Sequence, residues 1–172
     1  TCGFIESAKT EAIENILEAC SYKQQNPELK VIVTGCLAER YRSQIEEEIP
    51  EVDAVVGCAS NKAIDTIVAR LFHGEDHLES YGAKKDFPLG GKRVIGTPAH
   101  YAYLKIAEGC NTRCHYCAIP GIRGPLHSRD LADCVAEARR LAGEGVKELI
   151  VVAQAPTANG EDRGQPGSSC AL

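Results

Sequence analysis

One loop organises the chain: Glu108-Gly-Cys-Asn-Thr-Arg-Cys-His-Tyr-Cys-Ala-Ile-Pro-Gly-Ile-Arg-Gly124. It places Cys110, Cys114 and Cys117 in a C-x3-C-x2-C spacing, with no fourth cysteine nearby. Three thiolates on one short loop can hold three irons of a cubane [4Fe-4S] cluster and leave the fourth iron open. The amine and carboxylate of S-adenosyl-L-methionine can occupy such an iron. The spacing therefore predicts a cluster that binds S-adenosyl-L-methionine.

Structural zinc is the alternative for this loop. Zinc prefers four closed ligands, usually supplied as two paired C-x2-C knuckles. His115 could be the fourth ligand, although a histidine between Cys114 and Tyr116 in a tight loop is more often a solvated side chain. A strand is expected before the loop and a helix after it, which is the context of an iron-sulfur motif. We therefore expect iron at this loop.

Composition narrows the class of protein. The 172 residues are 44% hydrophobic and can form one domain or two small ones. No apolar run is long enough to cross a bilayer, and the net charge of -5 argues against non-specific nucleic-acid binding. The sequence has nine cysteines, and the metal-type spacing of three of them, together with the missing signal peptide, favours a reducing cytoplasm. Because the sequence starts at Thr1 and contains no methionine, we expect a piece of a longer protein.

Strands and helices alternate in the first half of the sequence. Apolar residues at helical spacing predict helices over 7–21, 37–49 and about 61–72, and β-branched runs predict strands over 30–34 and 52–57. Residues 1–80 are therefore predicted to form a three-layer-like α/β domain with a parallel sheet. Ligands bind beyond the carboxyl ends of such strands, where Cys36 follows one strand and Cys2 is expected to follow another.

The second half of the sequence begins another α/β fold. No periodicity is found from 75 to 100, and residues 81–100 are predicted to be a linker between domains. Residues 101–154 are predicted to form one β-loop-α-β unit, the start of a truncated (β/α) barrel. Its parts are a strand over 101–107, the cluster loop over 109–127, a helix capped by Ser128 through about Ala142, and a parallel strand over 148–153. The Gly/Pro/Ser-rich residues 155–172 are predicted to be an aberrant or disordered tail.

These motifs resemble the methylthiotransferase family of radical S-adenosylmethionine enzymes over roughly residues 1–154. The loop, followed by Ser128-Arg129, is similar to the cluster loop of that family. The family holds a second cluster on three cysteines of its N-terminal domain. Cys2 in Thr-Cys-Gly-Phe-Ile-Glu-Ser-Ala-Lys and Cys36 in Thr-Gly-Cys-Leu-Ala-Glu-Arg-Tyr match two of these, and the first would lie upstream of Thr1. The resemblance implies two [4Fe-4S] clusters and S-adenosyl-L-methionine as cofactors.

The family has two branches with different substrates. One methylthiolates an adenosine in tRNA, and the other methylthiolates the β-carbon of an aspartate in small-subunit ribosomal protein twelve. Three sequence segments resemble the ribosomal-protein branch: Cys2-Gly-Phe-Ile-Glu-Ser-Ala-Lys9, Tyr103-Leu-Lys-Ile-Ala-Glu108 and Ile119-Pro-Gly-Ile-Arg123. The resemblance implies this ribosomal protein as substrate, an electron donor such as flavodoxin or ferredoxin, and no membrane. RNA is a partner only in the tRNA alternative.

Other residues near the motifs have two interpretations each. Tyr116 could pack on the adenine of the cofactor or anchor the loop. Arg123 and Arg129 could pair with a carboxylate of the cofactor or with Glu108 or Asp130. Cys58 also follows a predicted strand, but we expect it in the core, where isolated cysteines are commonly found.

The sequence also departs from the family pattern. The family continues after Gln154 with an aspartate and a Thr-rich turn, whereas this sequence continues with Ala155-Pro156. Most of the barrel is therefore missing, and the fragment alone is expected to be inactive. A rival of another class is a non-catalytic iron-sulfur electron carrier, which would need a fourth ligand for each cluster. A broken reading frame whose product does not fold is a further alternative.

Overall fold

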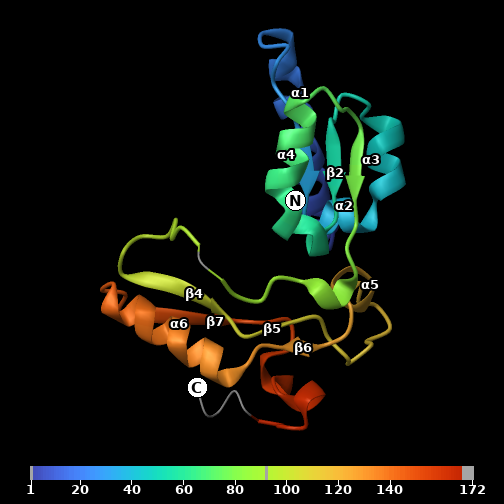
Figure 1. Ribbon diagram of the computed structural model, residues 1–172. Helices are drawn as coiled ribbons and strands as arrows, with labels where there is room; N and C mark the ends of the chain where they lie inside the picture. The colour runs from blue at the N-terminus through green and yellow to red at the C-terminus, as the bar shows by residue number, and fades with distance from the viewer. Residues whose placement is uncertain (1, 92, 168–172) are drawn as a thin grey trace. The chain divides into compact units, whose positions relative to one another are not determined.

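The computed structural model describes residues 2–91 and 93–167, and the chain divides into two compact units between Phe87 and Pro88. Both units are of mixed α/β type, as the sequence predicts (Figure 1). Within the described ranges, none of the helices has the length and apolar character needed to cross a membrane.

The first unit is built on a three-stranded parallel sheet with the order β1-β2-β3. Its strands are β1 (Ile32–Thr34), β2 (Ala54–Val56) and β3 (Leu78–Ser80). In the register, Ile32 lies opposite Ala54, which lies opposite Leu78. β1 and β2 fall inside the predicted strands. β3 was not predicted, because Leu78 is the one buried residue of 75–80 and no apolar repeat marks the strand.

Helices cover both faces of this sheet. On one face, Val33 and Val55 pack with α1 (Glu6–Ser21), α2 (Cys36–Arg40) and α3 (Arg42–Glu48). On the other face, Ala54 and Val56 pack with α4 (Ile64–Phe72). Figure 1 shows α3 and α4 on opposite sides of β2. The predicted three-layer arrangement is therefore confirmed.

Three details of the first unit differ from the prediction. The helix expected over 37–49 is divided at Tyr41, whose φ of -122° and ψ of 33° are not helical. A 3-10 helix, η2 (Cys58–Ala63), precedes α4. The first part of the predicted linker folds with this unit, because Phe87 is only 6% exposed and packs against the start of η2. Two further 3-10 turns are η1 (Tyr22–Gln24) and η3 (Lys84–Asp86).

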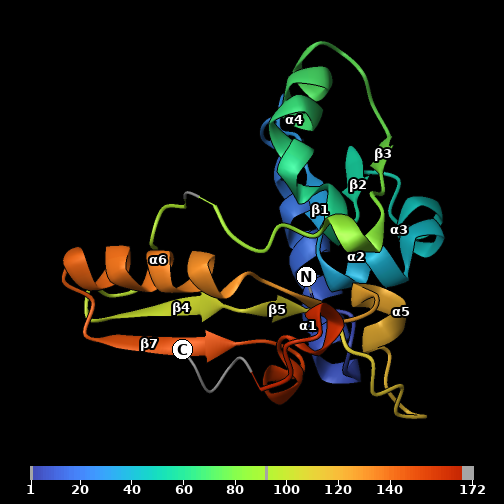
Figure 2. The same cartoon turned by 60° about the horizontal axis from the view of Figure 1, so that its bottom comes forward.

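The second unit contains the predicted β-loop-α-β arrangement. β4 (Tyr101–Lys105) and β7 (Glu148–Val152) are parallel, with Tyr101 opposite Glu148. α6 (Leu131–Gly143) packs on one face of this pair through Cys134 (Figure 2). The loop between β4 and α6 contains α5 (Ile119–Arg123) and is closed by the antiparallel pair β5 (Ala107–Glu108) and β6 (His127–Ser128).

The start of α6 also differs from the prediction. Ser128 was expected to cap this helix, but it lies in β6. Asp130 is the cap instead, because its Oδ1 accepts a hydrogen bond from the N–H of Ala132 at 2.9 Å. The interaction satisfies one of the N–H groups that the first helical turn leaves without an intrahelical partner.

The predicted disordered tail is wrong for residues 155–167. This segment forms the 3-10 turns η4 (Pro156–Ala158) and η5 (Glu161–Arg163). Asn159 is 3% exposed, and its Nδ2 donates to the carbonyl of Ile106 at 2.9 Å. The N–H of Gly160 donates to Oγ of Ser128 at 2.8 Å. These polar contacts hold the segment on the second unit, and residues 168–172 lie outside the described part of the chain.

Candidate cluster-binding site

The base of the cysteine loop is closed by backbone contacts. Glu108 pairs with His127 in the β5-β6 ladder, and the N–H of Cys110 donates to the carbonyl of Gly124 at 3.2 Å. Gly109 has a φ of +73°, and a Cβ there would lie 2.1 Å from the carbonyl oxygen of Pro125. Only glycine allows the two sides of the loop to approach so closely. The first cysteine is therefore held at a defined place.

Glu108 is a buried charge that joins the two ends of the loop. Its side chain is 1% exposed, and its Oε2 accepts hydrogen bonds from Nη1 of Arg123 at 3.1 Å and from Nζ of Lys105. Its Oε1 is buried and has no hydrogen-bond partner among the described residues. Arg123 ends α5, so this ion pair fixes the exit of the loop to its entry. The pairing of Arg123 with Glu108 was one of the two predicted interpretations.

The three cysteine side chains share one environment within the loop. Cys110, Cys114 and Cys117 are half-buried, whereas the residues between them, Asn111, Thr112, Arg113, His115 and Tyr116, are exposed. The thiol of Cys110 donates to Oγ1 of Thr112 at 3.3 Å, and the N–H of Thr112 donates back to the sulfur at 3.5 Å. The N–H of Cys117 donates to the carbonyl of Cys114 at 3.0 Å.

This donor set suits a cluster with three thiolate ligands. The three half-buried thiols come from one loop, and hydrogen bonds to sulfur are one means by which proteins tune iron-sulfur clusters. The three thiols are not already arranged around a metal-sized centre, since no group of three Cys, His, Asp or Glu side chains within 2–91 and 93–167 could hold an ion as it stands. Closing the loop around a cluster would have to bring them together.

The two other loop residues considered from the sequence are exposed. His115 is exposed, as expected for a solvated side chain. Tyr116 is 88% exposed, so its ring does not anchor the loop in the packed part of the unit. The remaining interpretation, that Tyr116 packs on the adenine of the cofactor, stays a prediction.

Cys2 and Cys36 lie on neighbouring segments in the first unit. A Cβ at Gly3 would lie 2.9 Å from the carbonyl oxygen of Cys36, so the backbones touch there. Nη1 of Arg40 donates to the carbonyl of Gly3 at 2.9 Å and holds the two segments together. Cys2 is exposed and Cys36 is half-buried. The structure therefore places both predicted ligands at the same edge of the sheet.

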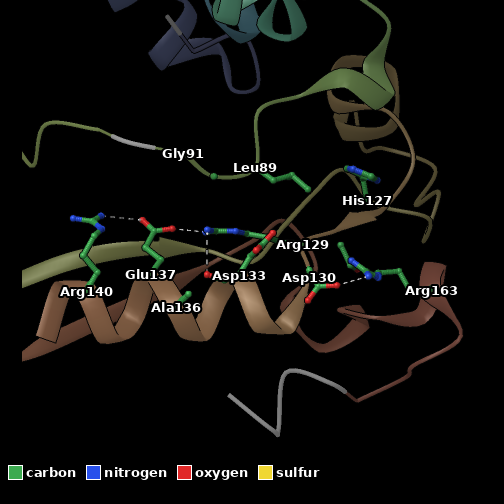
Figure 3. A pocket seen from close by; sticks show the side chains of 12 residues that line it. Leu89, Gly91, His127, Arg129, Asp130, Asp133, Ala136, Glu137, Arg140 and Arg163 are labelled. Carbon is green, nitrogen blue, oxygen red and sulfur yellow. Dashed lines mark hydrogen bonds and ion pairs between the residues drawn. The ribbon is translucent and has the colours of Figure 1, made fainter. Parts of the chain in front are cut away.

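A hollow of about 660 Å³ lies over α6 in the second unit (Figure 3). Arg129 lines it and pairs with Glu137, which also lies 3.1 Å from Nη2 of Arg93. Arg163 pairs with Asp130 at 2.6 Å. Arg129 was expected to meet the cofactor or Asp130, so its pairing with Glu137 is a correction. The arginines of this hollow are already paired with carboxylates. These ion pairs connect α6 and its cap Asp130 to Arg93, Arg129 and Arg163.

The sequence analysis did not single out Glu137 or Asn159. Glu137 lies eight residues after Arg129, on the next helix, and a charged residue at that position is ordinarily solvated. Asn159 lies in a segment without periodicity, 53 residues after the carbonyl that it binds. No local pattern marks either contact.

Comparison with known proteins finds one family match within each unit. Residues 1–57 match the model of Uncharacterized protein family UPF0004, and residues 104–163 match the Radical SAM superfamily. The chain is 48% identical over 169 residues to the ribosomal protein uS12 methylthiotransferase RimO of Acetivibrio thermocellus. It is 45% identical to the proteins of the same name from Caldicellulosiruptor saccharolyticus and Clostridioides difficile. Each alignment covers 94% of this chain and 36–37% of the relative.

Proposed function

The chain belongs to the radical SAM methylthiotransferase family, and from this premise we propose that it takes part in methylthiolation of ribosomal protein uS12 in the cytoplasm. The observation that carries the proposal is the identity of 45–48% over 94% of the chain to relatives named for that reaction. The chain spans little more than a third of the length of these relatives, so the activity, the substrate and an electron donor such as flavodoxin or ferredoxin are proposed for the whole protein.

In this proposal Cys110, Cys114 and Cys117 hold a [4Fe-4S] cluster. When bound, that cluster supplies the one-electron chemistry that cleaves S-adenosyl-L-methionine. Glu108 and Arg123 keep the entry and exit of the loop together, which limits how far the thiols can separate. Tyr116 is proposed to offer its exposed ring to the adenine of S-adenosyl-L-methionine.

Cys2 and Cys36 are proposed to hold the second cluster with a further ligand. The contact of Gly3 with Cys36 and the bond from Arg40 support this assignment, because they keep the two segments adjacent. The site lies beyond the carboxyl end of β1, where parallel sheets commonly bind ligands.

The ligand assignment is tested by iron and sulfide content after anaerobic reconstitution. Each single substitution of Cys110, Cys114 or Cys117 by alanine should remove about four irons per chain, because the [4Fe-4S] cluster is lost when one of its ligands is lost. His115→Ala in the same loop and Cys20→Ala in the first unit are the controls and should keep full iron content. Zinc in place of iron, or equal metal loss in His115→Ala, would contradict the proposal.

The substrate assignment needs a parallel assay of the whole protein that contains this chain, on uS12 and on tRNA. S-adenosyl-L-methionine and a reductant are added to both, and the products are analysed by mass spectrometry. We expect a methylthio group on an aspartate of uS12. A methylthiolated adenosine with unmodified uS12 would reject the assignment.

A further inference from the structure

Cys58 lies beside Cys36 at the carboxyl edge of the first sheet. β1 and β2 are parallel neighbours, and their last pair in register is Thr34 with Val56. A single glycine follows each last residue, Gly35 in one strand and Gly57 in the other, and the next residue is a cysteine in both cases. Each cysteine therefore lies two residues beyond a register partner of the other strand, Cys36 at the start of α2 and Cys58 at the start of η2.

Packing contacts keep these two cysteines together beyond the ends of the strands. Cys36 packs against the cluster formed by Cys58, Ala59 and Phe87. Glu39, in the same helical turn as Cys36, accepts a hydrogen bond on Oε2 from the N–H of Cys58 at 3.0 Å. A Cβ at Gly57 would lie 2.5 Å from the same oxygen, so α2 lies directly against the start of η2.

We propose that Cys36 and Cys58 form a disulfide in the cluster-free protein when it meets a hydroperoxide. The two strands that carry these cysteines are adjacent in the sheet, about 4.8 Å apart where they pair, and Cys36 packs against the cluster that contains Cys58, so both side chains lie in one apolar cluster. Neither thiol is in a disulfide in this structure.

The exposures of the two thiols set the order of the reaction. Cys36 is half-buried and Cys58 is 3% exposed, so the peroxide oxidises Cys36 first. With hydrogen peroxide, the sulfur of Cys36 attacks one oxygen and the O–O bond breaks, so that a sulfenic acid and one water form. The sulfur of Cys58 then displaces the hydroxyl group, which leaves as a second water with the thiol proton. Two thiols are oxidised by two electrons, and one hydroperoxide is reduced.

The consequence for the second cluster rests on the proposed function. If Cys36 is a cluster ligand, the disulfide removes it from the ligand set and prevents assembly until a thiol reductant restores it. A bound cluster would in turn protect Cys36 from oxidation. The pair would therefore keep Cys36 in a reversible oxidation state, since sulfinic acid forms when no second thiol intercepts the sulfenic acid.

The test is peptide mapping of the cluster-free 172-residue chain after exposure to hydrogen peroxide. We expect a linked peptide joining Cys36 to Cys58, lost in Cys58→Ser and retained in the control Cys20→Ser. In Cys58→Ser, Cys36 should be recovered as sulfinic acid. Cys36→Ser must also abolish the link, and it provides the same information if Cys58→Ser fails to fold by circular dichroism.

Two results would overturn the inference. One is a link from Cys36 to the exposed Cys2, and the other is sulfinic acid at Cys36 in the wild-type chain. The mapping needs no iron and no S-adenosyl-L-methionine. It can therefore fail while the cluster assignment stands, and it can succeed while the cluster assignment fails.

Discussion

The two units of the chain are stabilised in different ways. In the first unit, helices cover both faces of a three-stranded sheet and the contacts are mainly apolar. In the second unit, α6 covers one face of a two-stranded sheet, and Tyr103 on the other face is 43% exposed. Buried polar groups complement this smaller core, namely Glu108, Glu137 and Asn159.

This difference indicates which kind of substitution should destabilise each unit. An apolar layer depends on many small contacts spread over several side chains, so no single contact dominates its stability. A buried ion pair depends on every member, because removal of one leaves an uncompensated charge. The polar contacts of the second unit are concentrated at the base of the cysteine loop. Stability and cluster binding are therefore expected to change together in that unit.

The largest effect is expected for Glu108→Ala. Lys105 and Arg123 would lose their buried partner, which should lower the free energy of unfolding of the second unit by about 3–5 kcal/mol. Hydrogen exchange of peptides from each unit would measure this separately, and iron uptake by the loop should fall as well. The exposed Glu161→Ala is the control. Equal loss of hydrogen-exchange protection in Glu108→Ala and Glu161→Ala would show that the buried ion pair does not stabilise the second unit.

Leu71→Ala tests the apolar layer of the first unit. Leu71 is buried between α4 and the sheet, so a cavity is expected there at a cost of about 3 kcal/mol. Hydrogen exchange should increase in the first unit, while the peptides of the second unit remain protected. Exposed Phe72→Ala is the matched control on the same helix. Increased exchange in both units would contradict their independent stabilisation.

Asp53 is a buried charged residue in the first unit and predicts a pH dependence of its stability. Burial raises the pKa of Asp53, but the bonds from Lys23 at 2.6 Å and from the N–H of Val31 outweigh it and leave the pKa below its usual value. In the unfolded chain the pKa of Asp53 is about 3.9, and above this pH the ionised carboxylate stabilises the folded unit. This stabilisation is lost as the pH falls through the lower pKa of Asp53 in the folded unit.

Urea unfolding of Asp53→Asn between pH 3 and pH 7 measures this contribution. The variant should lose about 2 kcal/mol at pH 7, and the difference from wild type should shrink below about pH 4. Exposed Asp65→Asn serves as the control. A difference that stays constant over the whole range would exclude the proposed charge contribution.

The smallest effect is expected for Asn159→Ala. The carbonyl of Ile106 would lose its bond from Nδ2 at a cost of about 1–2 kcal/mol, with faster exchange near the end of β4. The exposed Thr157→Ala in the same segment should leave the exchange unchanged. If Asn159→Ala also leaves it unchanged, residues 155–167 do not support the second unit.

Local patterns predicted most of the first unit. Alternating apolar helices and β-branched strands gave the parallel sheet, because each segment carries its own period. β3 was missed, since Leu78 packs on α4 through a contact that no neighbour in sequence indicates. The break at Tyr41 was missed because the apolar repeat continues through it.

The loop shows the same division between local and distant information. Spacing identified Cys110, Cys114 and Cys117 as one group, and their shared half-burial agrees with that grouping. The pairing of Arg129 with Glu137 depends on how α6 turns back over the strand. The structure of residues 155–167 depends on the carbonyl of Ile106 and the hydroxyl of Ser128, which are far away in the sequence. Neither could be obtained from composition or periodicity.

The central claim is that three thiolates of the loop hold a cluster with one iron open to S-adenosyl-L-methionine. The most direct measurement is electron paramagnetic resonance of the reduced, reconstituted chain, with and without S-adenosyl-L-methionine. To isolate the loop, Cys2 and Cys36 are replaced by alanine. We predict a [4Fe-4S] signal whose g values shift when S-adenosyl-L-methionine is added. A signal that is identical in both samples would contradict the account.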